Sequence, residues 1–450
     1  MEKLLENISE YMDDPLKNGA IANSLRELSP AELEELWDSL TSEQTLQLFL
    51  IIDQETRSAL MAELNHSDQE FLLEGLSEQL TKDLLLYMEP DDLADLIQSV
   101  SSDVRENLWS NLTEDSRREI EFLLRYDEDD AAGIMTPRYG ALRAEITVEQ
   151  AISFVRRDMA DKLETIYYLY VVDGFKRLIG VISLRQLLSA ENNETVGDLM
   201  ERNVIYVKDE TDQEDAARVL EDNDFLAIPV VDDQLRLLGI VTFDDVIDVI
   251  REEQTEDIYK MGAMGGNTDS YLETSVFGLV LKRLPWLIIL LLAGTITTNV
   301  LDGYSELTVT ALFLTLFVPV ITQTGGNTGT QSSTLMIRGL ATGELKFRDL
   351  GKVLFKELFV AFIIGLATGG VIFLRSLYLP PGLELLEALT IASALSCVVL
   401  FATLLGCLVP MVIHRLGFDP TVAAGPLMST VIDVCGLTIY YEIARLVLKL

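Results

Sequence analysis

The hydrophobic pattern of the chain changes near Tyr271. Beyond this residue come long apolar segments, each long enough to cross a hydrocarbon core of about 30 Å as a helix. They cover residues 284–304, 308–336, 353–379, 388–413 and 420–448. The pattern therefore predicts a five-span α-helical membrane domain over residues 271–450.

Residues 1–130 instead show leucines at helical spacing behind short polar starts. Three of these starts fit a capping box, in which a hydroxyl and a Glu or Gln three residues later satisfy the first amides of a helix. They pair Ser29 with Glu32, Thr41 with Gln44, and Ser67 with Glu70. Short helices that each bury one stripe are typical of a solenoid. We therefore predict an all-α superhelical N-terminal domain.

Residues 131–250 repeat themselves. A β-branched run at 168–173, followed by a second at 177–184, is echoed by runs at 227–232 and 236–243. Runs of this length and composition, separated by turn residues, are typical of paired strands. Each half is predicted to be a strand–helix–strand–strand–helix unit, so this part of the chain is an α/β domain.

This repeat resembles a tandem pair of CBS domains, a sensor fold that often binds adenine nucleotides. In the second module, residues 239–245 match the nucleotide pattern of that family. The resemblance implies that Thr242 and Asp245 contact the phosphate and ribose of a nucleotide such as ATP. The first module has Ser183 but carries Gln186 where the pattern has an aspartate.

An acidic stretch joins the repeat to the apolar part of the chain. Asp245, Asp248 and Glu252 fall on one helical face at i, i+3 and i+7, and Glu256 lies four residues further on. Hard oxygen ligands at this density suit Mg²⁺ or Ca²⁺, and the alternative is a solvated charged linker. We predict an acidic connecting (plug) helix over residues 244–270, with a glycine-rich joint at its end.

The N-terminal domain contains a similar pair of acids. Asp91 and Asp95 stand at i and i+4, which places them on one face of a helix. Like charges at this spacing repel by a few tenths of a kcal/mol unless a cation binds between them. The pair therefore indicates either a solvated face or a cation site.

The charge of the chain is divided as sharply as its hydropathy. Residues 271–450 hold 11 acidic and 11 basic side chains, so the whole net charge of −38 lies in residues 1–270. Such an acidic front excludes nucleic acid as a partner and favours solvation or cation binding. Residues 1–14 are acidic without an apolar core, which predicts no signal peptide. The three cysteines all lie in the membrane part and indicate neither a disulfide framework nor a zinc site.

Two polar features interrupt the apolar segments. Asp433 is the only charge between residues 420 and 441, although an ionised carboxylate in the bilayer centre costs roughly 2.5–3.5 kcal/mol. The run 322–334 is too polar for a lipid-facing helix, so we expect it to line a cavity or an unwound turn.

Together these features predict a cation path. Asn327 and Thr328 would supply oxygens, and Asp433 would supply the charge. The alternatives are a structural acid hydrogen-bonded inside a helix bundle and a packed contact between helices. One carboxylate is little charge for a divalent ion. A two-fold axis along the path would bring two Asp433 side chains together, so we predict a homodimer.

Basic residues mark one side of the predicted lipid bilayer. They precede the first apolar segment and surround the connection between the second and third. By the positive-inside rule, residues 1–270 are cytoplasmic and the C-terminus is outside the cell membrane (inner or plasma membrane).

The order of these domains, the Gly-Gly-Asn-Thr-Gly run at 325–329, Pro426 and the Thr-Val-Ile-Asp run at 430–433 carry a family resemblance. Across nearly the whole chain they resemble the MgtE family of bacterial magnesium channels. The resemblance implies a homodimeric, Mg²⁺-selective channel for magnesium uptake that closes when cytosolic Mg²⁺ is plentiful. It implies no enzymatic activity.

The resemblance also implies particular site residues. Those of the pore are Gly326, Asn327, Thr328, Gly425, Ser429 and Asp433. Those that would hold regulatory Mg²⁺ are Asp91, Asp95, Asp212, Glu214, Asp224, Asp245, Asp248, Glu253, Glu256, Asp257 and Asp419. Gly425 departs from the family pattern, which has an asparagine there, and no further acid of the N-terminal domain is matched around residues 55–65.

Two other classes of function remain open. One is a carrier for another divalent cation such as Co²⁺ or Mn²⁺, or a carrier coupled to Na⁺ or H⁺. Ion-coupled carriers often show inverted repeats and several buried charges, and neither is evident in the sequence. The other is a membrane metalloprotease, which needs a His-Glu-x-x-His motif, whereas the membrane part holds His414 alone.

Overall fold

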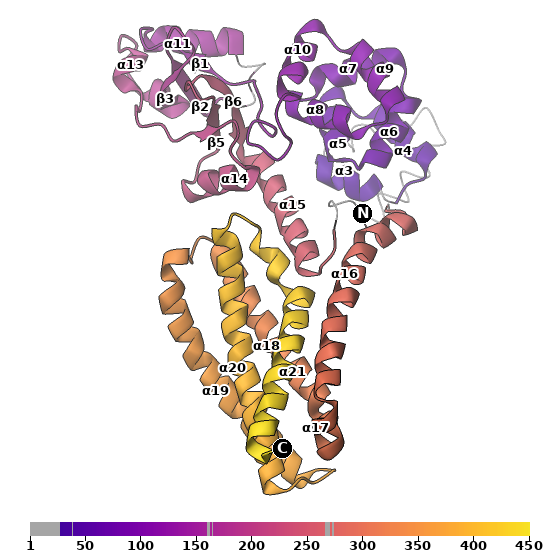
Figure 1. The fold of residues 1–450 in the computed structure, drawn as a ribbon. Helices are drawn as coiled ribbons and strands as arrows, with labels where there is room; N and C mark the ends of the chain where they lie inside the picture. The colour runs from indigo at the N-terminus through magenta and orange to yellow at the C-terminus, as the bar shows by residue number, and fades with distance from the viewer. Residues whose placement is uncertain (1–27, 38, 160–162, 164, 266–270, 272–273) are drawn as a thin grey trace. The chain divides into compact units, whose positions relative to one another are not determined.

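The computed structural model describes residues 28–37, 39–159, 163, 165–265, 271 and 274–450 (Figure 1). The chain forms two compact units that divide between Arg251 and Glu252. The predicted absence of a signal peptide concerns residues 1–14, which lie outside the described residues. The same holds for residues 266–270 of the predicted joint.

The N-terminal domain is a series of short helices (Figure 1). They are α3 (Pro30–Trp37), α4 (Ser42–Ile51), α5 (Gln54–Glu63), α6 (His66–Gly75), α7 (Glu78–Tyr87), α8 (Pro90–Ser99), α9 (Ser102–Asn111) and α10 (Glu114–Leu123). Contacts join mainly every second helix, such as α3 with α5, α5 with α7, and α6 with α8. The predicted superhelical domain is confirmed.

A twelve-residue repeat produces this regularity. From α4 onward each helix has ten residues and begins twelve residues after the helix before it. Fully buried leucines recur with the same period at Leu48, Leu60, Leu72, Leu84, Leu96 and Leu108. The backbone carbonyl of each accepts a hydrogen bond from the amide of the residue that ends its helix. Each repeat thus contributes one buried leucine and one closed helix end.

Two of the three predicted capping boxes are confirmed. Ser29 and Thr41 exchange the expected hydrogen bonds with residues three positions on. The third prediction is wrong, because Asn65 caps α6 by accepting from the amide of Asp68, and Ser67 lies inside the first turn. An asparagine two residues earlier competes successfully, since its short side chain caps as well as serine does.

Each half of the α/β repeat forms a three-stranded sheet. In the first, β1 (Ala141–Leu142) pairs in parallel with β2 (Tyr168–Val172), which pairs antiparallel with β3 (Leu178–Ser183). The second repeats this order with β4 (Val207–Lys208), β5 (Ala227–Val231) and β6 (Leu237–Thr242). The helices are α11 (Val148–Phe154), a π-helical turn (Val155–Met159), α12 (Leu184–Ser189), α13 (Val196–Leu199), α14 (Gln213–Asp222) and α15 (Phe243–Met261). The predicted element order is confirmed.

One hydrophobic core joins the second α/β module to the helical domain. It contains Leu93 and Leu96 of α8 together with Val246 and Val249 of α15. Because both helices bury their apolar faces in the same core, the first turn of α8 and the first turns of α15 are held in one packed body.

The second unit contains the long helices. They are α16 (Val276–Gly303), the short α17 (Ser305–Thr310), α18 (Phe313–Ala341), α19 (Leu350–Tyr378), α20 (Leu385–Arg415) and α21 (Gly425–Leu448). Single 3-10 turns precede α19 (Phe347–Asp349) and α21 (Pro420–Ala423). Figure 1 shows these helices running side by side, and α20 packs against α18, α19 and α21.

Three segments of the described chain are long and apolar enough to cross a membrane: Val276–Gly303, Phe347–Tyr378 and Leu385–Arg415. The helices α18 and α21 have comparable lengths of 29 and 24 residues but carry the polar run and Asp433. Each of the five predicted segments therefore corresponds to a long helix, and two of the five are too polar to qualify by composition.

The polar run of α18 is helical throughout. The prediction of an unwound turn is therefore wrong, because the hydroxyls of Thr322 and Thr328 return hydrogen bonds to carbonyls one turn earlier, at Val318 and Thr324. These hydroxyls are hydrogen-bonded to carbonyls of the same helix, so the backbone does not need to unwind.

Candidate functional site

Buried acids gather where α8 meets α15 in the first unit. Asp91 and Asp92 occupy the first turn of α8, and Asp91 is 8% exposed with an Oδ1 that has no hydrogen-bond partner. Burial and the nearby charge of Asp245 raise the pKa of Asp91 well above its usual value. Burial and the charge of Glu89 raise the pKa of Asp92 to about 7.

Asp245 is the partner that α15 contributes to this cluster. Burial raises its pKa to about 6, although hydrogen bonds from Thr242 act in the opposite direction. A helix N-terminus stabilises an acid by about 0.3–1 kcal/mol. Here burial and repulsion outweigh that contribution, since the pKa values of both α8 acids rise. A divalent cation among these carboxylates would remove the repulsion.

The sequence selected only part of this cluster. Asp91 and Asp245 come together as predicted, and Asp95, although exposed, adds its charge to the repulsion at Asp92. Asp92 was missed, and so was Glu63, whose charge adds to the repulsion at Asp92. The spacing rule paired Asp91 with Asp95 and overlooked the adjacent Asp92, which is partly buried.

Other predicted regulatory acids already have partners in the first unit. Asp212 caps α14 by accepting from the amide of Glu214, and Glu214 pairs with Arg218 at 2.8 Å. Asp248 pairs with Arg251 at 3.0 Å. Asp224 is exposed, with a φ of 53°. Within the described residues no group of three or more His, Cys, Asp or Glu side chains is arranged to hold one metal ion.

The end of α15 carries a different arrangement in the second unit. Glu253, Glu256 and Asp257 lie on its last turns, and the ammonium of Lys260 bridges two predicted metal ligands. Its Nζ lies 2.8 Å from Glu256 Oε1 and 2.8 Å from Asp419 Oδ2. Burial alone would raise the pKa of Asp419, but hydrogen bonds from Lys260 and Thr421 outweigh it and lower the pKa.

Gly425 belongs to the same contact. Its φ is 52°, and a Cβ there would collide with the carbonyl oxygen of Met261, the last residue of α15. The departure from the family pattern therefore has a packing reason, since only glycine lets the end of α15 lie against the start of α21.

The predicted nucleotide residues are close to each other. Thr242 ends β6, and both its amide and its hydroxyl donate to Asp245 Oδ2. In the first module Ser183 makes the matching capping box with Gln186. Tyr170, on β2, is 1% exposed, and its hydroxyl has no hydrogen-bond partner. Among the described residues of the module core, this hydroxyl is thus a buried polar group without a hydrogen-bond partner.

The helices α18 and α21 form an antiparallel seam in the second unit. Gly326 faces Ser429, and a side chain at Gly325 or Gly329 would collide with Ile432. Thr328 is buried, and its hydroxyl bonds to its own helix. For Gly326 and Thr328 the structure thus places the predicted pore residues in a packed interhelical contact.

Asn327 and Asp433 each directly follow a residue of the seam, Gly326 and Ile432. Their side chains therefore point away from the contact between α18 and α21. Asn327 is exposed and Asp433 is partly exposed, with no hydrogen-bond or ion-pair partner for Asp433 among the described residues. On α18, Gln323, Asn327 and Gln331 are all exposed at four-residue spacing. We call these three residues the polar face of α18.

A buried acid of this unit was missed by the sequence analysis. Glu357 of α19 is 8% exposed, and Ser332 of α18 donates a hydrogen bond to its Oε2 at 3.0 Å. Within the described part of the chain, no Lys, Arg or His nitrogen lies within 4.0 Å of this carboxylate. Glu357 is one buried charge, so the expectation that the membrane part lacks several buried charges stays a prediction.

Comparisons with known proteins agree with this architecture. Residues 28–129 match a family model described as the MgtE intracellular N domain, 131–193 and 196–252 match the CBS domain, and 318–443 match a divalent cation transporter, MgtE. The magnesium transporter MgtE of Thermus thermophilus is 45% identical over 334 residues, covering 74% of this chain and 73% of the relative. The chain belongs to the MgtE family.

Two further MgtE proteins support this assignment. Those of Enterococcus faecalis and Bacillus subtilis are 39% and 37% identical, and the alignments cover 74% and 73% of this chain and 72% and 71% of the relatives. The chain is thus a membrane protein of a transporter family, and the predicted family is confirmed.

Solved structures from MgtE proteins match the first unit. The cytosolic domain of the Mg²⁺ channel MgtE in complex with ATP aligns with 53% of this chain and 98% of its own, at 39% identity and a TM-score of 0.51. The soluble part of a magnesium transporter aligns with 56% and 98%, at 31% identity and a TM-score of 0.51. The predicted helical domain and CBS pair are confirmed as an MgtE cytosolic fold.

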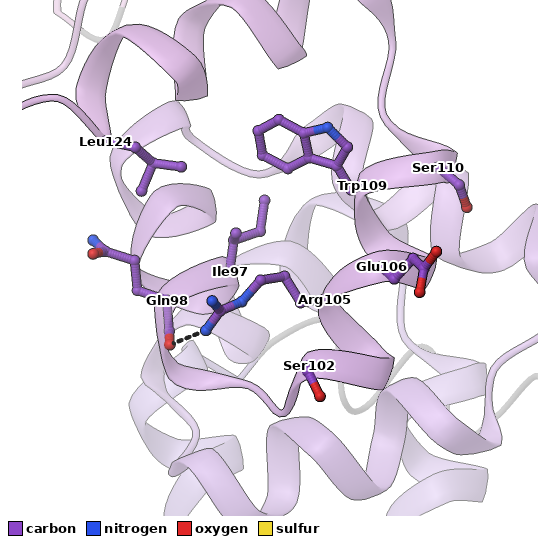
Figure 2. Close-up of a pocket in the computed structure, with 8 residues that line it drawn as sticks. All are labelled: Ile97, Gln98, Ser102, Arg105, Glu106, Trp109, Ser110 and Leu124. Atoms are coloured by element: carbon purple, nitrogen blue, oxygen red, sulfur yellow. Dashed lines mark hydrogen bonds between the residues drawn. The ribbon is translucent and has the colours of Figure 1, made fainter.

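A hollow of about 700 Å³ on the helical domain lies apart from these sites (Figure 2). Figure 2 shows Trp109 and Leu124 beside it and Arg105 donating to the carbonyl oxygen of Gln98, at 2.8 Å. None of the acids that the MgtE resemblance assigns lines this hollow, so we give it no part in the site.

The cluster of Asp91, Asp92 and Asp245 predicts a pH response in this MgtE protein. An acid whose pKa is higher in the folded than in the unfolded chain is penalised above the folded pKa and not below the unfolded one. With Mg²⁺ chelated, acidification from about pH 8 to about pH 5 should therefore raise the unfolding temperature of the first unit by a few degrees. Calorimetry of the full chain measures this shift.

Acids whose pKa is lowered in the folded chain affect its stability at lower pH. Hydrogen bonds from the backbone of Arg177 lower the pKa of Asp173, so its contribution is lost only below pH 4 or so. The matched control carries Asp91→Asn and Asp92→Asn, in which the stabilisation between pH 8 and pH 5 should largely disappear. A wild-type protein that loses stability across that range would contradict the assignment of a repulsive cluster.

Proposed function

We propose that the protein is a homodimeric, Mg²⁺-selective channel for magnesium uptake across the cell (inner or plasma) membrane. The observation that carries this proposal is the exposed polar face of α18, a helix that packs against the Asp433 helix α21 in a unit with three strongly apolar segments. Polar side chains at membrane depth line water or protein rather than lipid. A second copy across a two-fold axis would enclose this face and bring two Asp433 side chains together.

The ion would pass this region with water attached. Mg²⁺ dehydrates reluctantly and usually keeps several waters, so amide and carboxylate oxygens would contact its hydration shell. Asn327 and Asp433 are the side chains placed to do so. Gly326, Thr328 and Ser429 would act by letting α18 and α21 pack closely, and transport requires no catalytic residue.

Regulation would come from the first unit, in the cytoplasm. There the buried cluster of Asp91, Asp92 and Asp245 repels itself until a divalent cation binds. Mg²⁺ would thus favour the packed arrangement of α8 on α15, and α15 ends against the start of α21. Residues 1–270 would be cytoplasmic and the C-terminus external, as the distribution of basic residues favours.

A nucleotide is the second ligand that we propose for this unit. One MgtE cytosolic domain has been solved in complex with ATP. In this chain Tyr170 offers an unpaired buried hydroxyl, and Thr242 and Asp245 stand at the start of a helix. Because Asp244 and Asp245 would repel a bare triphosphate, the nucleotide should bind as its Mg²⁺ complex.

An ion-coupled carrier for Mg²⁺ or another divalent cation is the second candidate. The observation that favours it is Glu357, a buried acid in the membrane unit without a cationic partner among the described residues. Intramembrane acids of this kind mark proton relays as well as ion paths.

Reconstitution into liposomes separates the two candidates. A Mg²⁺-sensitive dye inside the vesicles should report entry of Mg²⁺ without any Na⁺ or H⁺ gradient, at a rate that falls as Mg²⁺ rises on the cytoplasmic side. Entry that requires such a gradient would assign a carrier, and a constant rate would contradict the proposed sensor. Light scattering of the purified protein should give the mass of two chains.

A further inference from the structure

Glu357 lies where three helices of the membrane unit meet. It projects from α19, receives the hydrogen bond from Ser332 of α18, and lies near the buried thiol of Cys407 on α20. The α18 and α20 backbones are in close contact at this level, because a Cβ at Gly406 would collide with the carbonyl oxygen of Gly329. The carboxylate therefore sits at a tight junction that leaves little freedom to its neighbours.

Two consecutive serines of α18 donate hydrogen bonds to neighbouring segments close to Glu357. Ser332 donates to Glu357, and Ser333 donates to the carbonyl oxygen of Ala423 at 3.4 Å, just before α21 begins. Consecutive residues of a helix point about 100° apart, so these bonds hold α18 from two directions. The bond to Glu357 is the shorter of the two and the one made to a charged group, which strengthens it.

The rotation of α18 about its axis decides where its polar face points. Gln331 directly precedes Ser332, and Asn327 lies one turn earlier on the same face of α18. A rotation that broke the bond between Ser332 and Glu357 would turn Asn327 and Gln331 with it. Glycines at positions 325, 326 and 329 let α18 pack closely on α21, and the bond to Glu357 adds a directional contact to this packing.

We propose that Glu357 is a positioning residue for ion permeation. Its carboxylate accepts the hydrogen bond of Ser332, fixes the rotation of α18, and thereby aims Asn327 and Gln331 at the ion path. This inference rests on the proposed channel function, and it explains why an acid is kept where a buried charge is costly.

The first test compares two substitutions of the same residue. Glu357→Gln keeps an acceptor oxygen for Ser332, whereas Glu357→Leu removes it. In liposomes we expect Glu357→Gln to retain most of the wild-type Mg²⁺ flux and its preference over Ca²⁺. Glu357→Leu and Ser332→Ala should each lower the flux by about tenfold, as small misplacements of binding groups do. The double variant should be no worse than Glu357→Leu alone.

A matched control removes a similar bond elsewhere. Ser396 of α20 donates to the carbonyl oxygen of Gly365 on α19 at 2.7 Å, away from the polar face of α18. Ser396→Ala should lower thermal stability about as much as Ser332→Ala but leave flux near the wild-type value. Equal loss of flux in both variants would reduce Glu357 to a general packing role and overturn the proposal.

A second readout does not depend on transport. The thiol introduced by Asn327→Cys should react with a water-soluble maleimide in the purified protein, with the labelled position assigned by mass spectrometry. Glu357→Leu should slow this labelling, and Glu357→Gln should not. A slowed rate in a protein that passes no Mg²⁺ at all would keep the positioning role and reject the channel.

Two outcomes would reject the positioning role directly. If Glu357→Gln loses as much flux as Glu357→Leu, the charge itself takes part in transport. If Ser332→Ala leaves both flux and labelling at wild-type values, the hydrogen bond does not set the rotation of α18.

Discussion

Replacing Asp433 with alanine is expected to abolish Mg²⁺ uptake while leaving a folded dimer. Asp433 is partly exposed on α21, the helix that packs against α18, and no described residue forms a hydrogen bond or ion pair with it. On the proposed path, removing it would leave a passing divalent ion without compensating charge at membrane depth. A hundredfold loss of initial rate would correspond to about 2.7 kcal/mol of barrier, and the liposome assay with an internal dye measures it.

The control for this variant is Asp302→Asn, which removes an exposed acid at the far end of α16. Its uptake rate should remain close to the wild-type value, and both variants should elute as the same oligomer. Undiminished uptake by Asp433→Ala would remove this residue from the ion path and leave it as a structural acid.

Loss of the acidic cluster should uncouple transport from cytosolic Mg²⁺. In the variant Asp91→Ala, Asp92→Ala, Asp245→Ala, we expect uptake at low Mg²⁺ to stay within about twofold of wild type. At high cytosolic Mg²⁺ the rate should no longer fall. A ligand shifts a conformational equilibrium only by its difference in affinity for the two states, and these carboxylates would supply that difference.

Three exposed acids of the same domain provide a control of equal charge. They are Asp103, Glu106 and Glu121, on the outer sides of α9 and α10. Their replacement by alanine should leave closure by Mg²⁺ intact, because surface charges are screened within about 10 Å by salt. Closure that survives in the cluster variant would mean that another site senses the ion, and closure that is lost in the control would mean that net charge does.

Much of the architecture follows from local patterns in the chain. Apolar length, the repeated strand pairs and the segregation of charge gave the domain order, and Asp433 was evident because no other charge lies near it in the sequence. The twelve-residue repeat was missed because its capping residues differ in type, among them Asp53, Asn65 and Ser77. The period is also hard to see because several of these helices contain more than one leucine, of which only one recurs every twelve residues.

What the sequence could not supply depends on contacts between distant segments. Asp91 is buried and Asp92 is partly buried because α8 packs into a core shared with the second CBS module, whereas Asp95 is exposed. Glu357 follows a lysine near the start of a helix, where charges are ordinary, and only the approach of α18 and α20 makes it a buried acid. Gly326 and Thr328 share a polar run with Asn327, yet the helical rotation turns Gly326 into the seam and buries Thr328.

The ammonium of Lys260 gives the protein a cation that cannot diffuse away. It sits between Glu256 and Asp419 and carries half the charge of Mg²⁺. A tethered group competes at an effective concentration in the millimolar range, so a dissolved ion must displace it to reach these two carboxylates. The cluster around Asp91 has no such competitor among the described residues. Titration with Mg²⁺ is therefore expected to proceed in two concentration ranges, with the membrane end of α15 responding after the cytosolic cluster is filled.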